Sequence, residues 1–405
     1  MSSPPRSAFA RLRALLHGVP PAAGLDAVEL HLGESRLGPP PAIDFTPLAS
    51  AEGWTRYPRL GGSAELRAAY GQWLGRRFGV RHSLSDGTLA LEPTPGTKQA
   101  VAVTLSLAVA DARRARTGVP AVVMPNPFYP TYRGGAEAAG ARPVFYTSYD
   151  AGDAGPVEAA VRAAGGRAAA VIVCNPGNPR GEIMPADTLR AVARIAARAG
   201  ALLVVDECYT DLSLGRAAPG YLSLVEEDGG AAGPFVVLHS LSKRSGTPGL
   251  RSGFLAGDPR TVGAYAGHNR LCGVSCALPV DAVSTALWSD DTHVARARAA
   301  LAKNWELADE TLGDLPRYRR AEAGFFLWLP VGDDEETTRR LWSSHALMVM
   351  PGRYLAAEGP EGVNPGLGHV RIALVHDAVL MRTALTRLRK ALLSFGATCE
   401  WGEPA

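Results

Sequence analysis

A lysine with serines and an arginine around it follows a short apolar run in the middle of the chain. The run FVVLH (235–239) is typical of a buried strand, and the stretch SLSKRSGTPGLRSG comes directly after it. Ser240 and Ser242 precede Lys243 in that stretch, and Arg251 follows the lysine by eight residues. An amine can react with a carbonyl group, and hydroxyl and guanidinium groups beside it can bind an anion. Alone, such a stretch is more typical of a solvated loop. Whether it forms a functional site depends on the other residues that the chain brings to it.

A carboxylate, a phenol and an amide stand at the ends of two other apolar runs. AAAVIVC (168–174) is followed by NPGNPRG, which contains Asn178. ALLVVDE (201–207) contains Asp206, and Tyr209 comes three residues later. Ligands of parallel sheets bind beyond the carboxyl ends of the strands, so we expect these side chains to share one site with the lysine.

These groups together match what pyridoxal phosphate requires of a protein. Lys243 could form the Schiff base, and Asp206 could face the ring nitrogen and keep it protonated. A lone carboxylate that closes an apolar strand is costly unless it is paired, which favours such a role for Asp206. Tyr209 could donate a hydrogen bond to the phenolic oxygen of the ring, and Asn178 could share that task.

The phosphate of that cofactor would need donors of its own. Ser240, Ser242 and Arg251 could supply them, with the arginine acting as a bidentate fork. In PTPGTKQAVAV (93–103) a helix is predicted to begin at Gly96 and Thr97, ahead of Lys98, and its free N–H groups could also bind phosphate. Each feature alone fits a loop, a turn or a helix cap, but their conjunction at strand ends is much more specific.

The elements that must position these residues follow an alternating pattern. Short apolar runs alternate with Ala/Arg-rich helical segments such as 184–200, which predicts βαβ units, a mainly parallel sheet and helices on both faces. We therefore predict an α/β fold with a large cofactor-binding domain over residues 51–290. The strands expected in it are AVVMP (121–125), AAAVIVC (168–174), ALLVVDE (201–207) and FVVLH (235–239).

The two ends of the chain are predicted to form a smaller α+β domain. Residues 291–405 alternate irregularly between helix and strand, and residues 1–50 form an arm and part of the same domain. The boundary is expected within a long helix around 280–310. The elements expected after it are a helix at 293–312, strands at 325–330, 347–351 and 369–375, and a helix at 377–395.

Composition excludes several other classes of protein. The 42 basic and 39 acidic residues leave a net charge of only +3, and no dense basic tract suggests nucleic acid as a partner. No apolar run is long enough to span a membrane. Five cysteines without paired C-x-x-C spacing argue against a disulfide framework or a metal site. The Arg- and Ser-containing N-terminus fits an arm helix with Phe9, Leu12, Leu15 and Leu16 on one side better than a transit peptide, so we expect a cytoplasmic protein.

The motifs taken together resemble a known family. NPRG (178–181), DECY (206–209), SLSK (240–243) with Arg251, and VRIAL (370–374) resemble the class I/II aminotransferases of PLP fold type I, and the resemblance covers nearly the whole chain. It implies a large domain with a mainly parallel sheet between helices, a smaller α+β domain, pyridoxal 5'-phosphate as cofactor and small amino and keto acids as substrates.

The resemblance also assigns residues outside the strand ends. Tyr57 matches a tyrosine that reaches the phosphate in the partner subunit, which implies a homodimer with shared active sites. Tyr129, in PNPFYPTY, matches an aromatic residue that stacks on the cofactor ring. Arg371 matches the arginine that forks the substrate α-carboxylate, and Gly33 matches a glycine near that carboxylate.

Within the class, the chain most resembles the proteobacterial-type N-succinyldiaminopimelate aminotransferases. The stretches that carry this are CYTDLSL, SLSKRSGTPGLRSGFLAGD and PGRYLAAEGPEGVNPGLGHVRIALV. The implied reaction is ping-pong transfer from N-succinyl-diaminopimelate to 2-oxoglutarate in lysine biosynthesis. The chain differs from the subgroup in segments that are expected to contact the substrate side chain. Arg180 replaces a threonine, GES (33–35) replaces G-E-P, and NRLCGVS (269–275) lacks an aromatic residue and a histidine. Arg180 is either solvent-facing or a second anion fork for a distal carboxylate.

Two alternatives stay open at this point. An enzyme of the same fold in a biosynthetic cluster could use the same residues for elimination, cyclisation or amino transfer on another amino acid, and the departures favour it somewhat. A non-catalytic, aminotransferase-like regulator would need a DNA-binding domain ahead of the fold. Cofactor-fold residues begin by about residue 30, which disfavours that reading.

Overall fold

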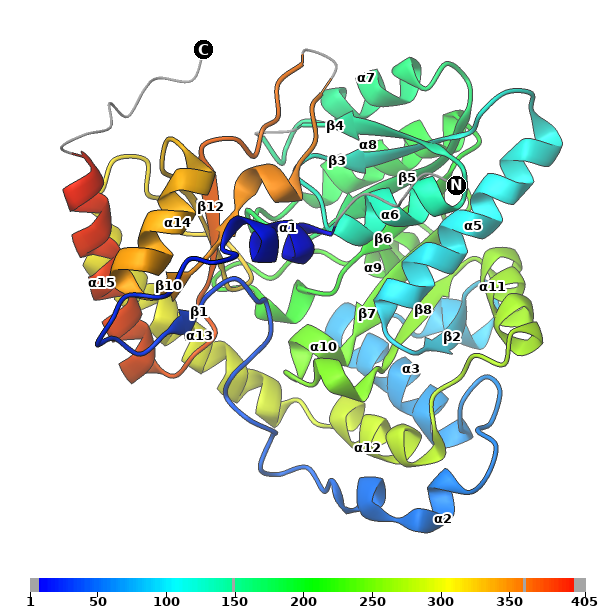
Figure 1. The fold of residues 1–405 in the computed structure, drawn as a ribbon. Helices are drawn as coiled ribbons and strands as arrows, with labels where there is room; N and C mark the ends of the chain where they lie inside the picture. Colours follow the sequence, from blue (N-terminus) through cyan, green and yellow to red (C-terminus); the bar gives the residue numbers. More distant parts are fainter. Residues whose placement is uncertain (1–6, 148–149, 360–361, 397–405) are drawn as a thin grey trace.

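The chain folds into a large part and a small part, and the long helix α13 (Thr292–Leu312) belongs to the small part (Figure 1). The computed structural model describes residues 7–147, 150–359 and 362–396. We use "large part" for the seven-stranded sheet with the helices that cover it, and "small part" for the helices and strands within residues 8–29 and 292–396. No helix among the described residues is long and apolar enough to cross a membrane.

A seven-stranded sheet forms the centre of the large part, with the strand order β2-β8-β7-β6-β5-β3-β4. All neighbours run parallel except β8, which is antiparallel to both β2 and β7. The predicted mainly parallel sheet is therefore confirmed. Its strands are β2 (Ala90–Thr94), β3 (Ala121–Pro125), β4 (Arg142–Tyr146), β5 (Ala168–Cys174), β6 (Leu202–Asp206), β7 (Phe235–Ser240) and β8 (Gly253–Gly257).

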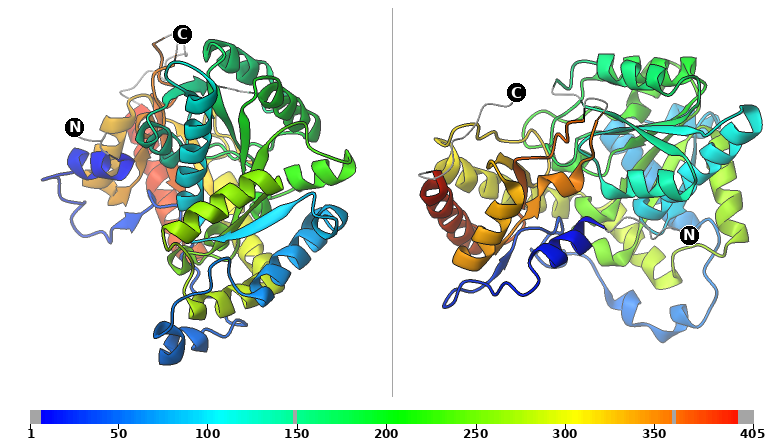
Figure 2. Two further views of the ribbon diagram at one scale, coloured as in Figure 1. Left: turned by 90° about the vertical axis from the view of Figure 1, so that its right-hand side faces the viewer. Right: turned by 45° about the horizontal axis from the view of Figure 1, so that its top comes forward.

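Helices cover both faces of this sheet, as Figure 2 shows from two further directions. They connect parallel strands, which a hairpin turn cannot do. The helices of the large part are α2 (Ala51–Trp54), α3 (Ala64–Phe78), α4 (His82–Ser85), α5 (Thr97–Ala115), α6 (Pro130–Ala138), α7 (Gly155–Ala163), α8 (Ala186–Arg198), α9 (Tyr221–Glu227), α10 (Leu241–Arg244), α11 (Pro259–Leu271) and α12 (Leu278–Ser289). Short 3₁₀ turns lie at η1 (Thr46–Ala49), η2 (Thr210–Leu212) and η3 (Pro248–Leu250).

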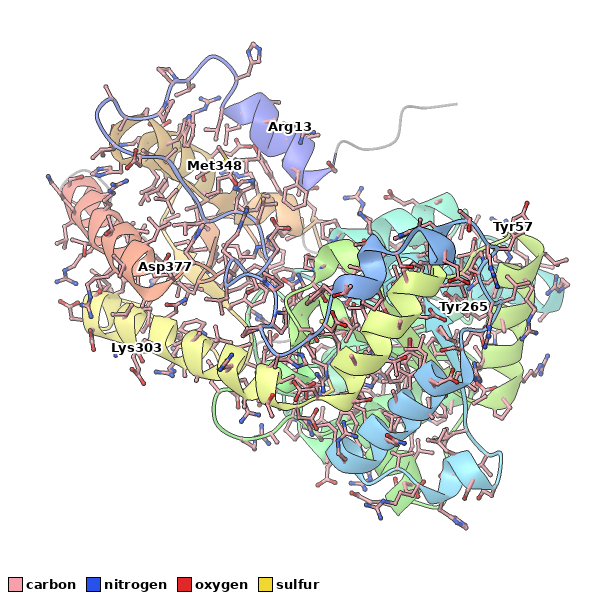
Figure 3. All side chains as sticks on the ribbon, turned by 90° about the horizontal axis from the view of Figure 1, so that it is seen from below. Arg13, Tyr57, Tyr265, Lys303, Met348 and Asp377 are labelled. Atoms are coloured by element: carbon pink, nitrogen blue, oxygen red, sulfur yellow. The ribbon has the colours of Figure 1, made fainter. Side chains whose placement is uncertain are left out.

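The small part is built on short strands that come from both ends of the sequence. β9 (Phe326–Pro330), β12 (His369–Ala373) and β11 (Met350–Pro351) form an antiparallel sheet, and β1 (Val28–Glu29) pairs in parallel with β10 (Leu347–Met348). Figure 3 shows Lys303 and Asp377 in this part of the molecule. Its helices are α1 (Ala8–Leu15), α13 (Thr292–Leu312), α14 (Asp334–His345), α15 (Ala378–Gly396) and the turn η4 (Gly352–Leu355).

Three details of the small part differ from the prediction. The single strand expected at 347–351 is two strands in different sheets, since β10 pairs with β1 and β11 with β12. The long helix expected around 280–310 is divided into α12 and α13 at Asp290 and Asp291. On α1, Leu12 is buried against the small part as expected for an arm, whereas Phe9 is 37% exposed.

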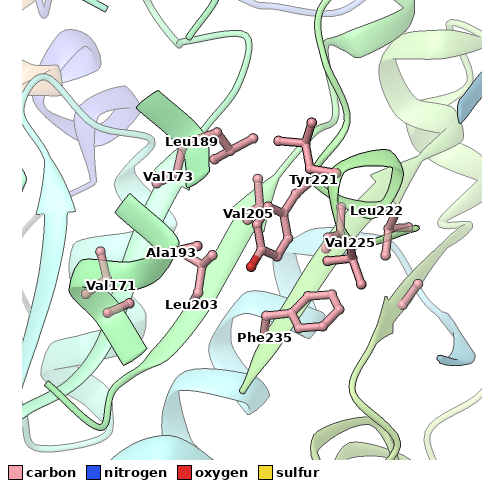
Figure 4. Packing of buried hydrophobic residues seen from close by; sticks show 14 of the residues in the cluster. Val171, Val173, Leu189, Ala193, Leu203, Val205, Tyr221, Leu222, Val225 and Phe235 are labelled. Atoms are coloured by element: carbon pink, nitrogen blue, oxygen red, sulfur yellow. The ribbon is translucent and has the colours of Figure 1, made fainter. Parts of the chain in front are cut away.

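The core explains why the strands of the large part read as continuous apolar runs. Side chains alternate between the two faces of a strand, and here both faces are buried. In β5, Val171 and Val173 belong to a buried cluster that includes side chains of α7, α8 and α9, while Ala170 and Ile172 belong to a second cluster with side chains of α5 and α6. Figure 4 shows the first of these clusters, with Leu189 among the labelled side chains.

Candidate active site

The short helix α10 carries Lys243 at the carboxyl end of β7. Ser240 caps this helix, because its Oγ accepts a hydrogen bond of 3.1 Å from the backbone N–H of Ser242. The two serine hydroxyl groups are also bonded to each other at 2.9 Å. The strand and the cap therefore fix both serines and the lysine relative to one another.

The Lys243 side chain reaches a half-buried position between aromatic rings. Its ammonium group donates to the carbonyl oxygen of Gly33 and lies 5.8 Å from the ring centre of Tyr209 and 5.4 Å from that of Phe325. Burial, with a smaller contribution from the Arg371 guanidinium, lowers the pKa of Lys243 to about 8. A larger share of this amine is therefore neutral near pH 8 than of an ordinary lysine.

Asp206 ends β6 with its carboxylate buried. Oδ2 accepts a hydrogen bond of 2.7 Å from the hydroxyl group of Tyr132, and Oδ1 accepts one of 3.2 Å from the backbone N–H of Cys208. Burial raises the pKa of Tyr132 well above its usual value, so the phenol keeps the proton that it donates. Tyr132 was not predicted as a site residue. It lies three residues after Tyr129, in the first turn of α6, whereas Tyr129 is the extended N-cap residue of that helix, so no helical spacing pairs the two in the sequence.

A chain of polar contacts leads from Tyr209 to a buried arginine. The side-chain amide of Asn178 donates to the Tyr209 hydroxyl at 3.5 Å, and Arg371 donates to the Asn178 Oδ1 at 3.4 Å. Arg371 also donates to the backbone oxygen of His31 at 3.1 Å and lies 4.0 Å above the ring centre of Phe326. Its Nε is buried without a hydrogen-bond partner among the described residues. A buried guanidinium with a free N–H is suited to bind a carboxylate.

Gly33 lies where no larger residue fits. A Cβ atom there would overlap the ring of Phe326 and press on Phe325. The close approach of this backbone segment brings the Gly33 carbonyl group to Lys243 and places the segment beside the arginine described above.

A cradle of backbone N–H groups forms at the start of α5. No side chain caps this helix, and its N-cap residue Gly96 has a φ of 82°. A Cβ at Gly96 would overlap the guanidinium of Arg251, which donates to the backbone oxygen of Pro95 at 3.0 Å. Arg251 thus lies beside the free N–H groups of the helix, where an anion is favourable. The Thr97 hydroxyl lies 3.3 Å from the sulfur of Cys208, next to the buried carboxylate.

The other four candidate residues are exposed, paired or half-buried. Tyr57 is 98% exposed and stands at the edge of the molecule in Figure 3. Lys98 is exposed on the first turn of α5. Arg180 is bound to Glu182, whose Oε1 accepts hydrogen bonds of 3.1 and 2.8 Å from it. Tyr129 is half-buried at the start of α6, with its ring centre 5.6 Å from that of Tyr132.

The donor set fits pyridoxal phosphate. An amine with a lowered pKa, a buried carboxylate with its own hydrogen-bond partners, and an uncapped helix beside a guanidinium are what the aldehyde, the ring nitrogen and the phosphate of that molecule require. The buried guanidinium of Arg371, whose Nε has no partner within the described ranges, is also suited to bind a carboxylate.

Comparisons with known proteins point the same way. The sequence model of the family described as aminotransferase class I and II matches residues 26–388. The 4-dedimethylamino-4-oxo-anhydrotetracycline transaminase of Streptomyces rimosus is 30% identical over 87% of this chain and 91% of its own length. A probable N-succinyldiaminopimelate aminotransferase of Mycobacterium tuberculosis is 30% identical over 72% of this chain and 70% of its own. The crystal structure of an aminotransferase from Neisseria meningitidis has a TM-score of 0.86 and 31% identity, over 97% of each chain.

Proposed function

Because the chain belongs to the class I and II aminotransferases, which are pyridoxal phosphate-dependent transaminases, we propose that it moves the α-amino group of an amino acid to 2-oxoglutarate by ping-pong transfer at the site around Lys243. The observation that carries this proposal is the buried guanidinium of Arg371, with an unpartnered Nε, joined through Asn178 to Tyr209 beside the lysine. A carboxylate on Arg371 would bring the α-carbon of an amino acid toward the amine.

Each residue of the site has a task in this proposal. Pyridoxal phosphate, when bound, supplies an electron sink that lets the substrate α-carbon lose a proton. Asp206 would hold the ring nitrogen in its charged form, and Tyr209 and Asn178 would donate to the ring oxygen. Tyr129 would pack against the ring. The residues that would hold the phosphate are Ser240, Ser242, Arg251, Gly96, Thr97 and Lys98, with Tyr57 of a second copy.

The proton itself is moved by Lys243. A neutral amine accepts a proton and its ammonium form returns it, and a lysine with a pKa of about 8 does both near neutral pH. Arg371 and Gly33 keep the substrate next to this amine, since the guanidinium grips the carboxylate and the glycine backbone lies against Lys243.

For the amino donor we propose N-succinyl-diaminopimelate, as in lysine biosynthesis. The support is the resemblance of three long stretches and the similarity to a relative that is named for this substrate. The relative from Streptomyces rimosus is named for a polycyclic ketone, so an enzyme of another biosynthetic route is the second candidate. The role of Arg180 as a fork for a distal carboxylate stays a prediction, and its pairing with Glu182 weighs against it.

A panel of amino donors tests the proposal. The holoenzyme is incubated with 2-oxoglutarate and each donor, and glutamate formation is followed over many turnovers. We expect steady glutamate formation with N-succinyl-diaminopimelate. If a product forms without glutamate, the enzyme catalyses another reaction on the same fold. If glutamate forms only with other donors, N-succinyl-diaminopimelate is not the substrate.

Tyr57 leads to a prediction about assembly. Its side chain is 98% exposed in one chain, so it can help bind the phosphate only across an interface with a second copy. We therefore expect a homodimer. In it, Arg251→Ala damages the site of its own subunit, whereas Tyr57→Phe damages the site of the other subunit. Mixing the two inactive variants should restore one intact site per mixed dimer, or about a quarter of wild-type activity after random exchange.

The matched control is Tyr57→Phe mixed with the double variant Tyr57→Phe/Arg251→Ala, which has no intact combination and should stay inactive. Light scattering reports the assembly independently. A fully active monomer, or equal recovery in both mixtures, would contradict a shared site.

A second prediction concerns the pH dependence of Lys243. Only the neutral amine reacts with an aldehyde, and burial lowers the pKa of this group to about 8. The neutral fraction should therefore rise roughly tenfold per pH unit below 8 and level off above it. The measurement is the rate at which apoprotein incorporates pyridoxal phosphate at Lys243, trapped by borohydride and located by peptide mass. The cation of Arg371 also lowers this pKa, so Arg371→Met should move the plateau to higher pH. A wild-type rate that keeps rising steeply far above pH 8 would contradict the lowered pKa.

A further inference from the structure

A cavity of about 260 Å³ opens beside Lys243 and is not used by any of the roles above. It lies between the segment after β1 and the first turns of α13, where Figure 1 shows the chain running past α13 on its way to α2. Pockets that hold a whole drug-sized ligand usually measure about 300–1,000 Å³. The space therefore suits a side-chain-sized portion of a molecule whose reacting end is at the lysine.

The walls of this cavity are mainly apolar and stiff. Three consecutive prolines, 39–41, line one side, and their fixed φ angles keep the wall in shape without a ligand. Leu212, Leu301 and Phe325 line the rest and belong to the core of the small part. Such a surface favours an aliphatic or otherwise apolar stem.

The polar groups in the wall already have partners, with one exception. The Ser245 hydroxyl bonds the ring of His293 at 2.8 Å, and that ring bonds Asp290 at 2.7 Å on its other side. Asn304 donates to two backbone oxygens near the end of β12. Arg296, an exposed residue in the second turn of α13, lines the cavity, and no hydrogen bond or ion pair of Arg296 occurs in the described part of the chain. Arg180, by contrast, is neutralised by Glu182.

We propose that this cavity is a subsite for the distal part of the substrate, with an apolar stem along the proline wall and a terminal carboxylate on Arg296. The inference rests on the proposed function, because it takes the reacting end of the same substrate to be held by Arg371 at Lys243. It names the substrate class as amino acids with a long, acid-ended side chain. It also assigns the distal carboxylate to Arg296 instead of Arg180.

Binding of unreactive probes tests the subsite without requiring turnover. The probes are α,ω-dicarboxylic acids from succinate to suberate, together with octanoate, which matches suberate in length but has one carboxylate. Their dissociation constants for the holoenzyme are measured by calorimetry. Affinity should rise with chain length until the second carboxylate reaches Arg296, and suberate should bind more tightly than octanoate.

Matched variants assign the contacts. Arg296→Gln should weaken suberate binding by roughly tenfold to a hundredfold, as the loss of a charge-assisted pair does, and leave octanoate unchanged. Arg298→Gln is the control, since Arg298 is exposed on the same helix and does not line the cavity. Ala300→Phe, which fills the cavity, should weaken both long probes, whereas Ala299→Phe on the exposed side should weaken neither.

The outcomes separate this inference from the proposed function. An Arg296→Gln effect no larger than that of Arg298→Gln would overturn the assignment, and a selective loss of suberate binding in Arg180→Thr would move the distal carboxylate to Arg180. If the long probes bind Ala300→Phe as tightly as they bind the wild type, the cavity is not their binding site. Whether glutamate forms in the donor panel is a separate result, so an enzyme with other chemistry can still show this subsite.

Discussion

Lys243→Ala is expected to abolish nearly all turnover while the protein still binds pyridoxal phosphate. The amine is the group proposed to move the proton, and a positioned acid–base group alone contributes about 10²–10⁴ in rate. The proposed phosphate donors lie on other residues, among them Arg251 and the uncapped start of α5, so they should retain the cofactor without a covalent bond. We expect a loss of at least about 10⁴-fold in kcat, because the covalent link and the proton transfer are removed together.

Two measurements check this without relying on activity alone. Borohydride reduction should attach the cofactor to Lys243 in the wild type and to no residue in the variant, as seen by peptide mass. Equilibrium dialysis should still detect bound, non-covalent cofactor. Lys303→Ala, a change of an exposed lysine on α13, is the control and should behave as the wild type. Substantial turnover in Lys243→Ala, or cofactor attached elsewhere in the wild type, would refute the assignment.

In the large part, the strands that the sequence predicted have strong apolar signals and are buried on both faces. β3, β5, β6 and β7 are runs of Val, Ile, Leu and Ala, which is the pattern of a central parallel strand. The strands that escaped prediction have weak local signals. β2 and β4 are edge strands and each contains a proline, which edge positions tolerate. β8 begins and ends with glycine, because Cβ atoms there would overlap the backbone of β7.

The same limit applies where one segment serves two sheets. Residues 347–351 read as a single apolar strand, but β10 and β11 pair with different partners on either side of Val349. One of these partners, β1, comes from the first 30 residues of the chain. Pairing with a strand so far away in the sequence leaves no pattern within residues 347–351 that would predict the division into β10 and β11.

The candidate site was predictable where strand ends defined it. Asp206 and Lys243 end or follow neighbouring parallel strands, so their meeting follows from the topology. Tyr132 and Phe326 were not predicted, since their contacts depend on how α6 and the small part are oriented. The subsite at Arg296 depends on the N-terminal segment lying against α13, which no local pattern encodes.

Asp206→Ala is the second large expected effect, and it separates binding from chemistry. The cradle at the start of α5 should still hold the phosphate, so cofactor affinity should change far less than rate. The carboxylate is the group proposed to keep the ring nitrogen charged, and preorganised electrostatic stabilisation of this kind is often the largest contribution to catalysis. We expect kcat to fall on the order of a thousandfold, equivalent to about 4 kcal/mol of transition-state stabilisation.

Tyr132 provides the matched comparison for that loss. Its hydroxyl donates to the Asp206 carboxylate at 2.7 Å, so Tyr132→Phe removes one partner of the acid while the charge stays. Tyr132→Phe should therefore reduce kcat much less than Asp206→Ala, and Asp206→Asn, which keeps the shape but not the charge, should resemble the alanine variant. The absorbance of the bound cofactor reports the protonation of its ring nitrogen and should change in both Asp206 variants only. A fall in kcat below tenfold for Asp206→Ala, with an unchanged spectrum, would mean that another group charges the ring. An equal loss in Tyr132→Phe would mean that the position of the carboxylate matters as much as its charge.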